Sequence, residues 1–422
     1  MGLLLGCIAD DITGGSDLGL MLAAHGMPAT LCLGTPAEGR NFGSAAVVIA
    51  LKIRSIDATD AVDQALGAAD WLLAHGAAQL YYKYCSTFDS TDAGNIGPVT
   101  DALLDRLDEN FTVLLPAFPK NGRTVRDGVL YVDGVPLAES PMRDHPLTPM
   151  TRSSLIELMD AQTATGRTGL VPTTTVARGA NAIRRAFDVL KSEDKRYAVV
   201  DTVGDETLEP IAEACVDLKL ITGGSGVAAS LPSSLARRKR LTPIHGIAEL
   251  PSAGGYAAVL SGSCSAATRG QVARFVQNNP GIVVDPLQVA TGETSVESLA
   301  AEAERLAATG NVLIYSTADP ERLGVVQEML GIDASANLVE RTLAGIAERL
   351  QHTGTRKFLV AGGETSGAVA AALGTTEFEI GPEIDPGVPW MVTTTAPRMC
   401  VAFKSGNFGG PDFFERALGM LP

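Results

Sequence analysis

Residues 3–17 read LLLGCIADDITGGSD, and this stretch sets the fold class. Its apolar first half predicts a buried strand, and the glycines and hydroxyls that follow predict the start of a helix. Two adjacent carboxylates, Asp10 and Asp11, stand at the strand end, where open α/β sheets collect their ligands. Such a pair can hold a cation or accept a proton from a substrate hydroxyl. Capping by the hydroxyls or by Asp17 is the alternative, but a cap needs one such residue, so we favour a functional site.

The same alternation of strand and helix continues along nearly the whole chain. Short Val-, Ile- and Leu-rich runs alternate with Ala-rich amphipathic stretches, which is typical of parallel sheets covered by helices. We expect strands at 3–9, 46–51, 80–84, 112–115, 169–171, 198–201, 218–222, 256–260, 282–285, 312–316, 357–361, 377–380 and 400–403. We expect helices at 57–74, 176–190, 206–215, 296–308, 338–350 and 368–373, and one from about 266. The pattern predicts an α/β protein with two Rossmann-like domains built on mainly parallel sheets.

Two segments interrupt the alternation. Between residues 121 and 136, two Asp-Gly pairs flank the apolar run VLYV, which predicts a β-hairpin. From about 231 to 255 the chain holds three prolines, a glycine pair and the basic run RRKR, which we interpret as a solvated linker. The expected domains are therefore 1–230 and 256–422.

The composition excludes several classes of protein. Of the 422 residues, 45% are hydrophobic and 19% charged, which is enough apolar material for two cores and too little charge for disorder. The net charge of −15 repels polyphosphate, so we expect neither a nucleic-acid nor an anionic-membrane partner. No apolar stretch approaches the roughly 18 residues of a membrane span. The six cysteines show no C-x-x-C spacing, which favours reduced thiols in a cytoplasmic protein.

Polar side chains also gather after two further strands of the first half. Lys83 is followed within a few residues by Ser86, Thr87 and Asp89. Arg54, just past the strand at 46–51, adds a guanidinium fork that suits a carboxylate. A solvent loop leading into a capped helix is the alternative for the Lys83 segment. Together these loops suit a small acidic polyol better than an apolar ligand.

Three loops rich in glycine and hydroxyl groups stand in the second half. They read SGSCS at 261–265, GGETSG at 362–367 and KSGNFGG at 404–410. Backbone N–H groups exposed by small residues, especially at helix N-termini, bind anions. Three such loops in one domain predict a site for nucleotide phosphates.

The mode of nucleotide binding is narrowed by what the chain lacks. No Gly-Lys dipeptide occurs, so a Walker A loop is excluded, and no G-x-S-x-G elbow supports a serine hydrolase. The run GSGVAA at 224–229 nearly meets a dinucleotide fingerprint, but the acidic residue expected about 20 positions later is missing. An NAD(P)-dependent hydroxy-acid oxidoreductase therefore stays open as an alternative.

Taken in order, these motifs resemble the four-carbon acid sugar kinases, and within them the 3-oxo-tetronate 4-kinases. The resemblance spans essentially the whole chain and rests on IADDITG at 8–14, KIRS at 52–55, KYCSTFDS at 83–90, PAFP at 116–119, HPLTPM at 145–150, SGSCS at 261–265, GGETSG at 362–367 and KSGNFG at 404–409. The run TGGSG at 222–226 departs from the family pattern. A lone His145 is more often structural than catalytic, yet its motif is what favours 3-oxo-tetronate over threonate or erythronate.

The resemblance implies a separate function for each of the two domains. The substrate domain would be 1–230 and the ATP domain 256–422, with the active site in the interdomain cleft. ATP contacts are implied at Ser261, Ser263, Gly362, Gly363, Glu364, Thr365 and Gly406.

We therefore expect an ATP-dependent kinase that transfers the γ-phosphoryl group to the terminal hydroxyl of a four-carbon sugar acid. Threonate or erythronate kinases and a non-catalytic sugar-acid binding protein are alternatives, and a homo-oligomer such as a dimer is compatible with the sequence. Phosphoryl transfer calls for charge neutralisation, so Mg²⁺ is expected with ATP, although the sequence assigns it no ligands.

Each polar residue of the first half has an expected role in that reaction. Asp11 would accept the hydroxyl proton or hold the metal, supported by Asp10 and by Asp17. Arg54 and Lys83 would bind the substrate carboxylate. The substrate hydroxyls are expected to contact Asp89, with Ser86, Thr87 and His145 nearby.

Overall fold

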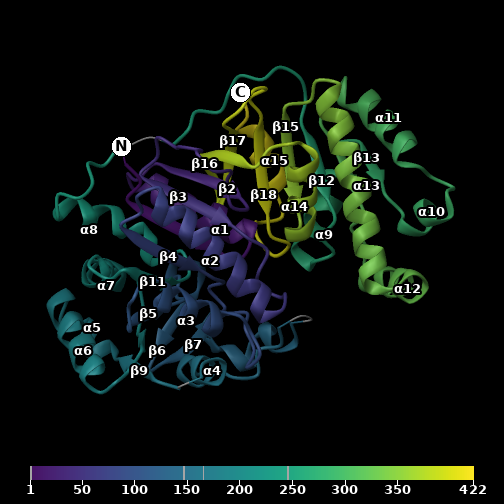
Figure 1. Ribbon diagram of the computed structural model, residues 1–422. Coiled ribbons are helices and arrows are strands. Elements are labelled where there is room, and N and C mark those ends of the chain that lie inside the picture. Colours follow the sequence, from purple (N-terminus) through teal and green to yellow (C-terminus); the bar gives the residue numbers. More distant parts are fainter. Residues whose placement is uncertain (1, 146–147, 165, 245–246) are drawn as a thin grey trace. The chain divides into compact units, whose positions relative to one another are not determined.

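The structure is a computed structural model that describes residues 2–145, 148–164, 166–244 and 247–422 (Figure 1). The chain forms two compact units, residues 1–246 and residues 247–422, each with its own hydrophobic core. Within the described ranges, no helix is long and apolar enough to cross a membrane.

The sheet of the first unit is parallel throughout. Its strands lie in the order β2-β3-β1-β4-β11-β5-β10-β9. Their bounds are β1 Leu5–Ala9, β2 Ala29–Leu33, β3 Ala46–Ala50, β4 Gln79–Lys83, β5 Thr112–Leu115, β9 Thr168–Val171, β10 Tyr197–Val200 and β11 Leu220–Gly223. Every residue of β1, β3 and β4 is buried, as expected for strands covered on both faces.

The helices of the first unit are mostly short connections between these strands. They are α1 Ile12–Ala24, α2 Ala58–Ala74, α3 Ile96–Arg106, α4 Leu155–Gln162, α5 Thr173–Val176, α6 Ala180–Ser192, α7 Leu208–Cys215 and α8 Leu231–Arg237. The glycine pair in the first turn of α1, Gly14 and Gly15, has a packing role as well. A Cβ on Gly15 would lie 2.9 Å from Ala50 Cβ and 2.9 Å from Leu31 Cδ1, so a bare backbone lets α1 approach the sheet closely.

The predicted hairpin is confirmed, with a third short strand added. β6 Arg123–Arg126, β7 Val129–Val132 and β8 Val135–Pro136 pair antiparallel in that order. Both Asp-Gly pairs adopt positive φ, with Asp127 at 52° and Gly128 at 74° in the first turn, which is the backbone that a two-residue hairpin turn needs. Asp201, just past β10, accepts hydrogen bonds from the N–H groups of Asp127 and Gly128 and fastens the hairpin to the main sheet.

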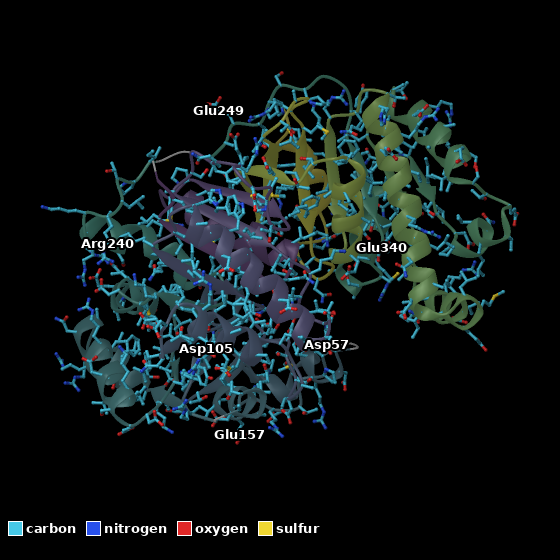
Figure 2. All side chains as sticks on the ribbon, viewed as in Figure 1. Asp57, Asp105, Glu157, Arg240, Glu249 and Glu340 are labelled. Atoms are coloured by element: carbon cyan, nitrogen blue, oxygen red, sulfur yellow. The ribbon has the colours of Figure 1, made fainter. Side chains whose placement is uncertain are left out.

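The basic run at 237–240 belongs to the first unit rather than to an extended linker. Its first arginine ends α8, and its arginines pair with acidic groups on α7 and the turn after it (Arg240 is labelled in Figure 2). These pairs are Arg237 with Glu209 at 2.7 Å, Arg238 with Glu213 at 3.1 Å and Arg240 with Asp217 at 2.7 Å. The run folds here because acidic side chains more than 20 positions earlier in the sequence neutralise its charge.

The sheet of the second unit is parallel except for one strand. Its order is β13-β14-β12-β15-β18-β17-β16, and β17 runs antiparallel to both of its neighbours. The bounds are β12 Ala258–Ser261, β13 Gly281–Val283, β14 Val312–Tyr315, β15 Lys357–Ala361, β16 Glu377–Asp385, β17 Val388–Thr393 and β18 Cys400–Lys404. The prediction of an α/β fold with mainly parallel sheets is therefore confirmed.

Long helices cover this second sheet. They are α9 Ala266–Phe275, α10 Pro286–Thr291, α11 Val296–Ala307, α12 Pro320–Leu330, α13 Ile332–His352, α14 Gly363–Ala372 and α15 Phe413–Gly419. The 21-residue α13 is contacted by α10, α11, α12 and α14 (Figure 1). Trp390 of β17 is fully buried and donates its indole N–H to the carbonyl of Ala417 at 3.0 Å. This hydrogen bond connects α15 to the sheet.

Candidate active site

The strand order of the first unit brings its polar loops together. β3, β1 and β4 are neighbours and run parallel, so the loops that follow them leave the same edge of the sheet. Asp10 and Asp11 follow β1, Arg54 follows β3, and Lys83 ends β4. Arg54 and Lys83, which lie 43 or more positions after Asp11 in the sequence, therefore come close to it at this edge.

A single guanidinium holds three carboxylates at this edge. Arg54 donates from Nε and Nη2 to the two oxygens of Asp10, both at 2.9 Å. Its Nη2 also lies 2.9 Å from Asp11 Oδ2, and its Nη1 lies 3.5 Å from Asp89 Oδ2. We call these four residues the Arg54 cluster. Asp10 and Asp89 are buried, whereas the Asp11 side chain keeps 30% of its surface exposed and can meet a ligand.

The backbone around the Arg54 cluster is fixed by local contacts. The side-chain amide of Asn95 donates to the carbonyls of Ile53 and Ile56, at 2.7 and 2.9 Å, and so holds the loop that carries Arg54. Asp89 sits in the left-handed region with φ of 22°, next to Phe88 at 63°. Strained backbone of this kind concentrates at functional sites, because the surroundings must hold it in place.

The pKa values of the neighbouring Asp10 and Asp11 side chains are shifted in opposite directions. Burial tends to raise the pKa of Asp11, but Arg54, Lys83 and the Gly14 N–H outweigh it and lower the pKa below its usual value. For Asp10 burial wins over Arg54, and the pKa is raised. Asp11 is therefore the carboxylate that stays ionised and partly open to solvent, whereas Asp10 mainly orients Arg54.

Lys83 and Asp17 form a second ion pair beside the Arg54 cluster. Lys83 Nζ lies 3.8 Å from Asp17 Oδ2 and donates to the carbonyl of Tyr84 at 3.0 Å. A Cβ on Gly14 would lie 2.5 Å from Asp11 Oδ1 and 3.1 Å from Lys83 Nζ, so a larger residue here would displace the Asp11 carboxylate. The N–H of Gly14 also donates to Asp11 Oδ1 at 2.5 Å, so that Asp11 caps the N-terminus of α1.

The other three predicted substrate contacts, Ser86, Thr87 and His145, differ in how they relate to the Arg54 cluster. Thr87 Oγ1 donates to Asp89 Oδ1 at 2.6 Å and belongs to the same group. Ser86, half-buried on the same loop, lies against Gly224. His145 Nδ1 accepts a hydrogen bond from the backbone N–H of Thr148 at 3.1 Å and lies 2.9 Å from the hydroxyl of the same residue. Across the described residues, no hydrogen bond or ion pair joins His145 to the Arg54 cluster; residues 146 and 147 of its motif lie outside them.

The glycines at 223–226 have a packing function inside the first unit. A Cβ on Gly224 would lie 2.5 Å from the carbonyl oxygen of Pro116, and a Cβ on Gly226 would lie 2.5 Å from that of Ala117. The backbone after β11 thus approaches the backbone after β5 more closely than any side chain allows. Close packing accounts for the near-match to a dinucleotide fingerprint without a cofactor.

The second unit contains a cavity of about 410 Å³. Loops after β12, β14, β15 and β18 supply its polar side, and α12 with the start of α13 supplies an apolar wall. The polar lining includes Gly262, Ser263, Ser316, Thr317, Gly362, Gly363, Glu364, Thr365 and Gly406, and the apolar lining includes Val284, Leu323, Val326, Ile332 and Val339. Its volume lies in the range of small-molecule sites.

Backbone donors converge on the polar side of this cavity. The helix α14 begins at Gly363, and its N-cap Gly362 offers no side-chain cap; helix N-termini of this kind bind anions. Gly362 has φ of 127°, a conformation that only glycine adopts readily. A Cβ on Gly406 would lie 2.6 Å from Ser263 Oγ, so the loop after β18 touches the loop after β12.

Six of the seven implied ATP contacts line the cavity: Ser263, Gly362, Gly363, Glu364, Thr365 and Gly406. The seventh, Ser261, is fully buried at the end of β12 and reaches the cavity only through Thr317, whose hydroxyl lies 2.8 Å from its own. Sequence reasoning missed the apolar wall from α12 and α13, and it missed the ion pair of Arg322 with Asp285 at 2.6 Å in the lining. The segment 320–330 carries an apolar face that could have indicated a helix.

Comparison with known proteins matches both halves of the chain to one family. A sequence profile described as a sugar-binding N-terminal domain covers residues 5–231, and a profile described as a nucleotide-binding C-terminal domain covers residues 258–414. A 3-oxo-tetronate kinase of Burkholderia multivorans is 49% identical over 99% of this chain and 97% of its own length. A 3-oxo-tetronate kinase of Haemophilus influenzae is 44% identical over 99% of this chain and its whole length.

Solved structures agree with this assignment. A Salmonella typhimurium protein named as a tRNA synthase superposes with a TM-score of 0.88 at 43% identity, covering 99% of both chains. A Haemophilus influenzae protein superposes with a TM-score of 0.81 at 43% identity, covering 99% of this chain and all of its own.

Proposed function

The chain belongs to the family of proteins with a sugar-binding N-terminal domain and a nucleotide-binding C-terminal domain, and from that premise we propose that it is a 3-oxo-tetronate kinase. It would transfer the γ-phosphoryl group of ATP to the terminal hydroxyl of 3-oxo-tetronate and give the 4-phosphate. The observation that carries the proposal is the identity of 44–49% to 3-oxo-tetronate kinases over 99% of the chain.

Asp11 has the properties that the proton acceptor needs. It is ionised, because its pKa is lowered, and it is partly exposed at the strand edge. Arg54 Nη2 at 2.9 Å fixes its orientation. The hydroxyl becomes acidic as its bond to phosphorus forms, so a weak base that is correctly placed can accept the proton in the transition state. Asp10, held by two bonds from Arg54, supports that geometry.

The cations of the cluster would bind the substrate carboxylate. Arg54 makes its strongest contacts through Nε and Nη2, whereas Nη1 has only the longer contact of 3.5 Å to Asp89. We propose that Nη1 and Lys83 Nζ bind the carboxylate of the sugar acid. Asp89, Ser86 and Thr87 then lie on a loop that can receive its hydroxyl and oxo groups. His145 is proposed as a further substrate contact, although its contacts in the structure are local.

The cavity of the second unit suits ATP in both chemistry and size. Its glycine-rich loops offer N–H donors for phosphates, and its wall of Leu323, Val326 and Val339 offers an apolar surface for a base. Ser263, the stretch from Gly362 to Thr365 and Gly406 are the proposed phosphate contacts, with Ser261 acting through Thr317.

A magnesium ion fits this lining as a partner of ATP. Within the described residues, no cluster of three or more His, Cys, Asp or Glu side chains is arranged to hold a metal by itself. Mg²⁺ on a nucleotide needs only one or two carboxylates, because phosphate oxygens and water complete its shell. Glu364, in the first turn of α14, and Glu340, from α13 and labelled in Figure 2, both line the cavity. The ion would neutralise charge on the β and γ phosphates when bound.

An ADP-release assay with a panel of acceptors tests the proposal. The purified chain is supplied with Mg-ATP and, in turn, 3-oxo-tetronate, threonate and erythronate, the alternative acceptors within the family. We expect the highest kcat/KM with 3-oxo-tetronate. Turnover of NAD(P)⁺ with a hydroxy acid would favour an oxidoreductase instead. Binding of a tetronate without turnover would favour a non-catalytic binding protein.

The cellular setting follows from the proposed reaction. A kinase that draws on ATP is expected in the cytoplasm, where the six free cysteines would stay reduced. The net charge of −15 disfavours an RNA partner of the kind that the name of the Salmonella neighbour suggests. A filter-binding assay with tRNA should therefore show no retention at physiological salt.

A further inference from the structure

Lys404 is a buried lysine to which the proposed reaction assigns no role. It ends β18, next to β15 in the sheet, and its side chain is fully buried. Its Nζ donates to Thr268 Oγ1 at 3.0 Å and to the carbonyl oxygens of Ser405 and Gly406, each at 3.0 Å. It also donates to the carbonyl of Phe408 at 3.1 Å. The ammonium therefore sits inside a ring of acceptors, three of which belong to the loop that follows it.

The orientation of these carbonyls fixes the orientation of the neighbouring N–H groups. A trans peptide is planar, so the C=O of one residue and the N–H of the next point to opposite sides. Because the carbonyls of Ser405, Gly406 and Phe408 face Nζ, the N–H groups of Gly406, Asn407 and Gly409 face away from it. None of these three N–H groups donates to an acceptor among the residues that the structure describes. Adjacent N–H groups turned one way, as those of Gly406 and Asn407 are, form a typical anion site.

Side chains of α9 and its N-cap also donate hydrogen bonds to carbonyls of the loop 405–410. The carbonyl of Gly406 also accepts from Ser265 Oγ at 2.5 Å and from Thr268 Oγ1 at 2.8 Å, both from the beginning of α9. Gln271 donates to the carbonyls of Phe408, Gly409 and Gly410 at 2.9–3.1 Å. The carbonyls of Gly406, Phe408, Gly409 and Gly410 thus accept hydrogen bonds from the protein. The N–H groups of Phe408 and Gly410 also donate within it, to Ser405 and Asp385, and Gly406 lines the cavity.

A second buried lysine of the same sheet, Lys357, has different surroundings from Lys404. Lys357 begins β15 and is 8% exposed, and its Nζ donates to the carbonyls of Gly255 and Pro422 at 3.3 and 2.9 Å. It lies at the opposite end of the strands from Lys404, because β15 and β18 run parallel with Lys357 beside Cys400. Neither Lys357 nor either of its acceptors lines the cavity.

We propose that Lys404 is a positioning residue that holds the loop 405–410 with the N–H groups of Gly406, Asn407 and Gly409 directed toward the phosphates of the nucleotide. The inference rests on the proposed function, since it assumes that the cavity binds ATP. Burial lowers the pKa of this lysine to about 7, and a phosphate nearby would favour its charged form. Lys404 touches no substrate atom itself and acts through the peptide groups of the loop.

Calorimetric titration of the full chain with ATP and with adenosine tests the proposal, using the variant Lys404→Met. Methionine fills similar space but donates nothing. We expect the Kd for ATP to rise by about tenfold or more, because several phosphate contacts lose their alignment. The Kd for adenosine, which lacks phosphates, should stay within about twofold. In the kinase assay the KM for ATP should rise, while the KM for the sugar acid stays unchanged.

Lys357→Met is the matched control. It removes a buried ammonium from the same sheet, so its loss of thermal stability should resemble that of Lys404→Met, while its affinity for ATP stays at the wild-type value. If Lys404→Met does not fold, Thr268→Val carries the test, because it removes only the hydroxyl between Nζ and the Gly406 carbonyl. A loss of ATP affinity of about threefold or more would support the proposal.

Three results would overturn the inference. These are an unchanged Kd for ATP in Lys404→Met, an equal loss for adenosine, and an equal loss in the Lys357→Met control. A wild-type chain that binds no ATP is a distinct outcome, since it contradicts the proposed function and the inference together.

Discussion

Replacing Asp11 by asparagine separates its charge from its structural role. The new amide oxygen can still accept a hydrogen bond from the Gly14 N–H in the first turn of α1, and asparagine caps helices about as well as aspartate. The negative charge beside Arg54 Nη2 and the proton acceptor are both lost. We expect kcat to fall by about 100-fold or more. That corresponds to about 2.7 kcal/mol in the activation barrier at about 1.36 kcal/mol per factor of ten. The partly exposed ion pair should contribute only about 1 kcal/mol to stability.

The assay measures ADP release at several concentrations of ATP and sugar acid, with thermal unfolding followed in parallel. Asp57→Asn is the control, because Asp57 caps α2 through the Thr59 N–H at 2.8 Å and carries the same chemical change at an exposed helix start (labelled in Figure 2). The control should keep normal turnover. Turnover of Asp11→Asn within a few-fold of wild type would refute the assignment of Asp11, and equal losses in both variants would trace the effect to capping.

Arg54→Lys cannot reproduce the two bonds to Asp10, so the KM for the sugar acid should rise by about tenfold in steady-state kinetics, and an unchanged KM would exclude Arg54 from the substrate site. Gly406→Ala places a Cβ 2.6 Å from Ser263 Oγ, so titration should show weaker binding of ATP by about tenfold, whereas normal binding would separate this loop from the phosphates. Chelation by EDTA should abolish ADP release and added Mg²⁺ should restore it; persistent turnover would contradict a role for the ion. Burial lowers the pKa of Lys404 from 10.5 to about 7, so between these pH values the unfolded chain binds a proton that the folded chain does not, and the free energy of unfolding rises with pH. Between pH 7.5 and 9.5, denaturant unfolding should show the wild type gaining about 2.5 kcal/mol relative to Lys404→Met, and parallel pH profiles would contradict a buried, titrating lysine.

Local patterns in the sequence were enough to predict much of the fold. The run from Leu3 to Asp17 forms a buried strand, a loop of two carboxylates and a helix, as its pattern predicts. The Asp-Gly pairs predict the hairpin because the conformation of two residues fixes such a turn. Elements whose identity depends on distant contacts were missed. The strand β17 was not predicted, and its place is fixed by pairing with β16 and β18 on either side.

The candidate site was predictable as a set of loops but not as a geometry. Parallel strands carry their loops to one edge, so Asp10, Arg54 and Lys83 could be grouped from sequence alone. That one guanidinium would hold three carboxylates was not visible, because it depends on side-chain orientation across 44 residues. The role of Asn95 depends on the loop path around Ile53, and the role of Lys404 depends on which carbonyls face its ammonium. Neither arrangement leaves a local pattern in the sequence.

Phosphorus NMR of the reaction product tests the central claim most directly. The purified chain is incubated with Mg-ATP and 3-oxo-tetronate labelled with ¹³C at C4, and the product is examined for coupling between phosphorus and the labelled carbon. The proposed function predicts a phosphomonoester coupled to C4, formed in step with ADP. A product that carries no phosphorus, or one whose phosphate is not attached to C4, would contradict it.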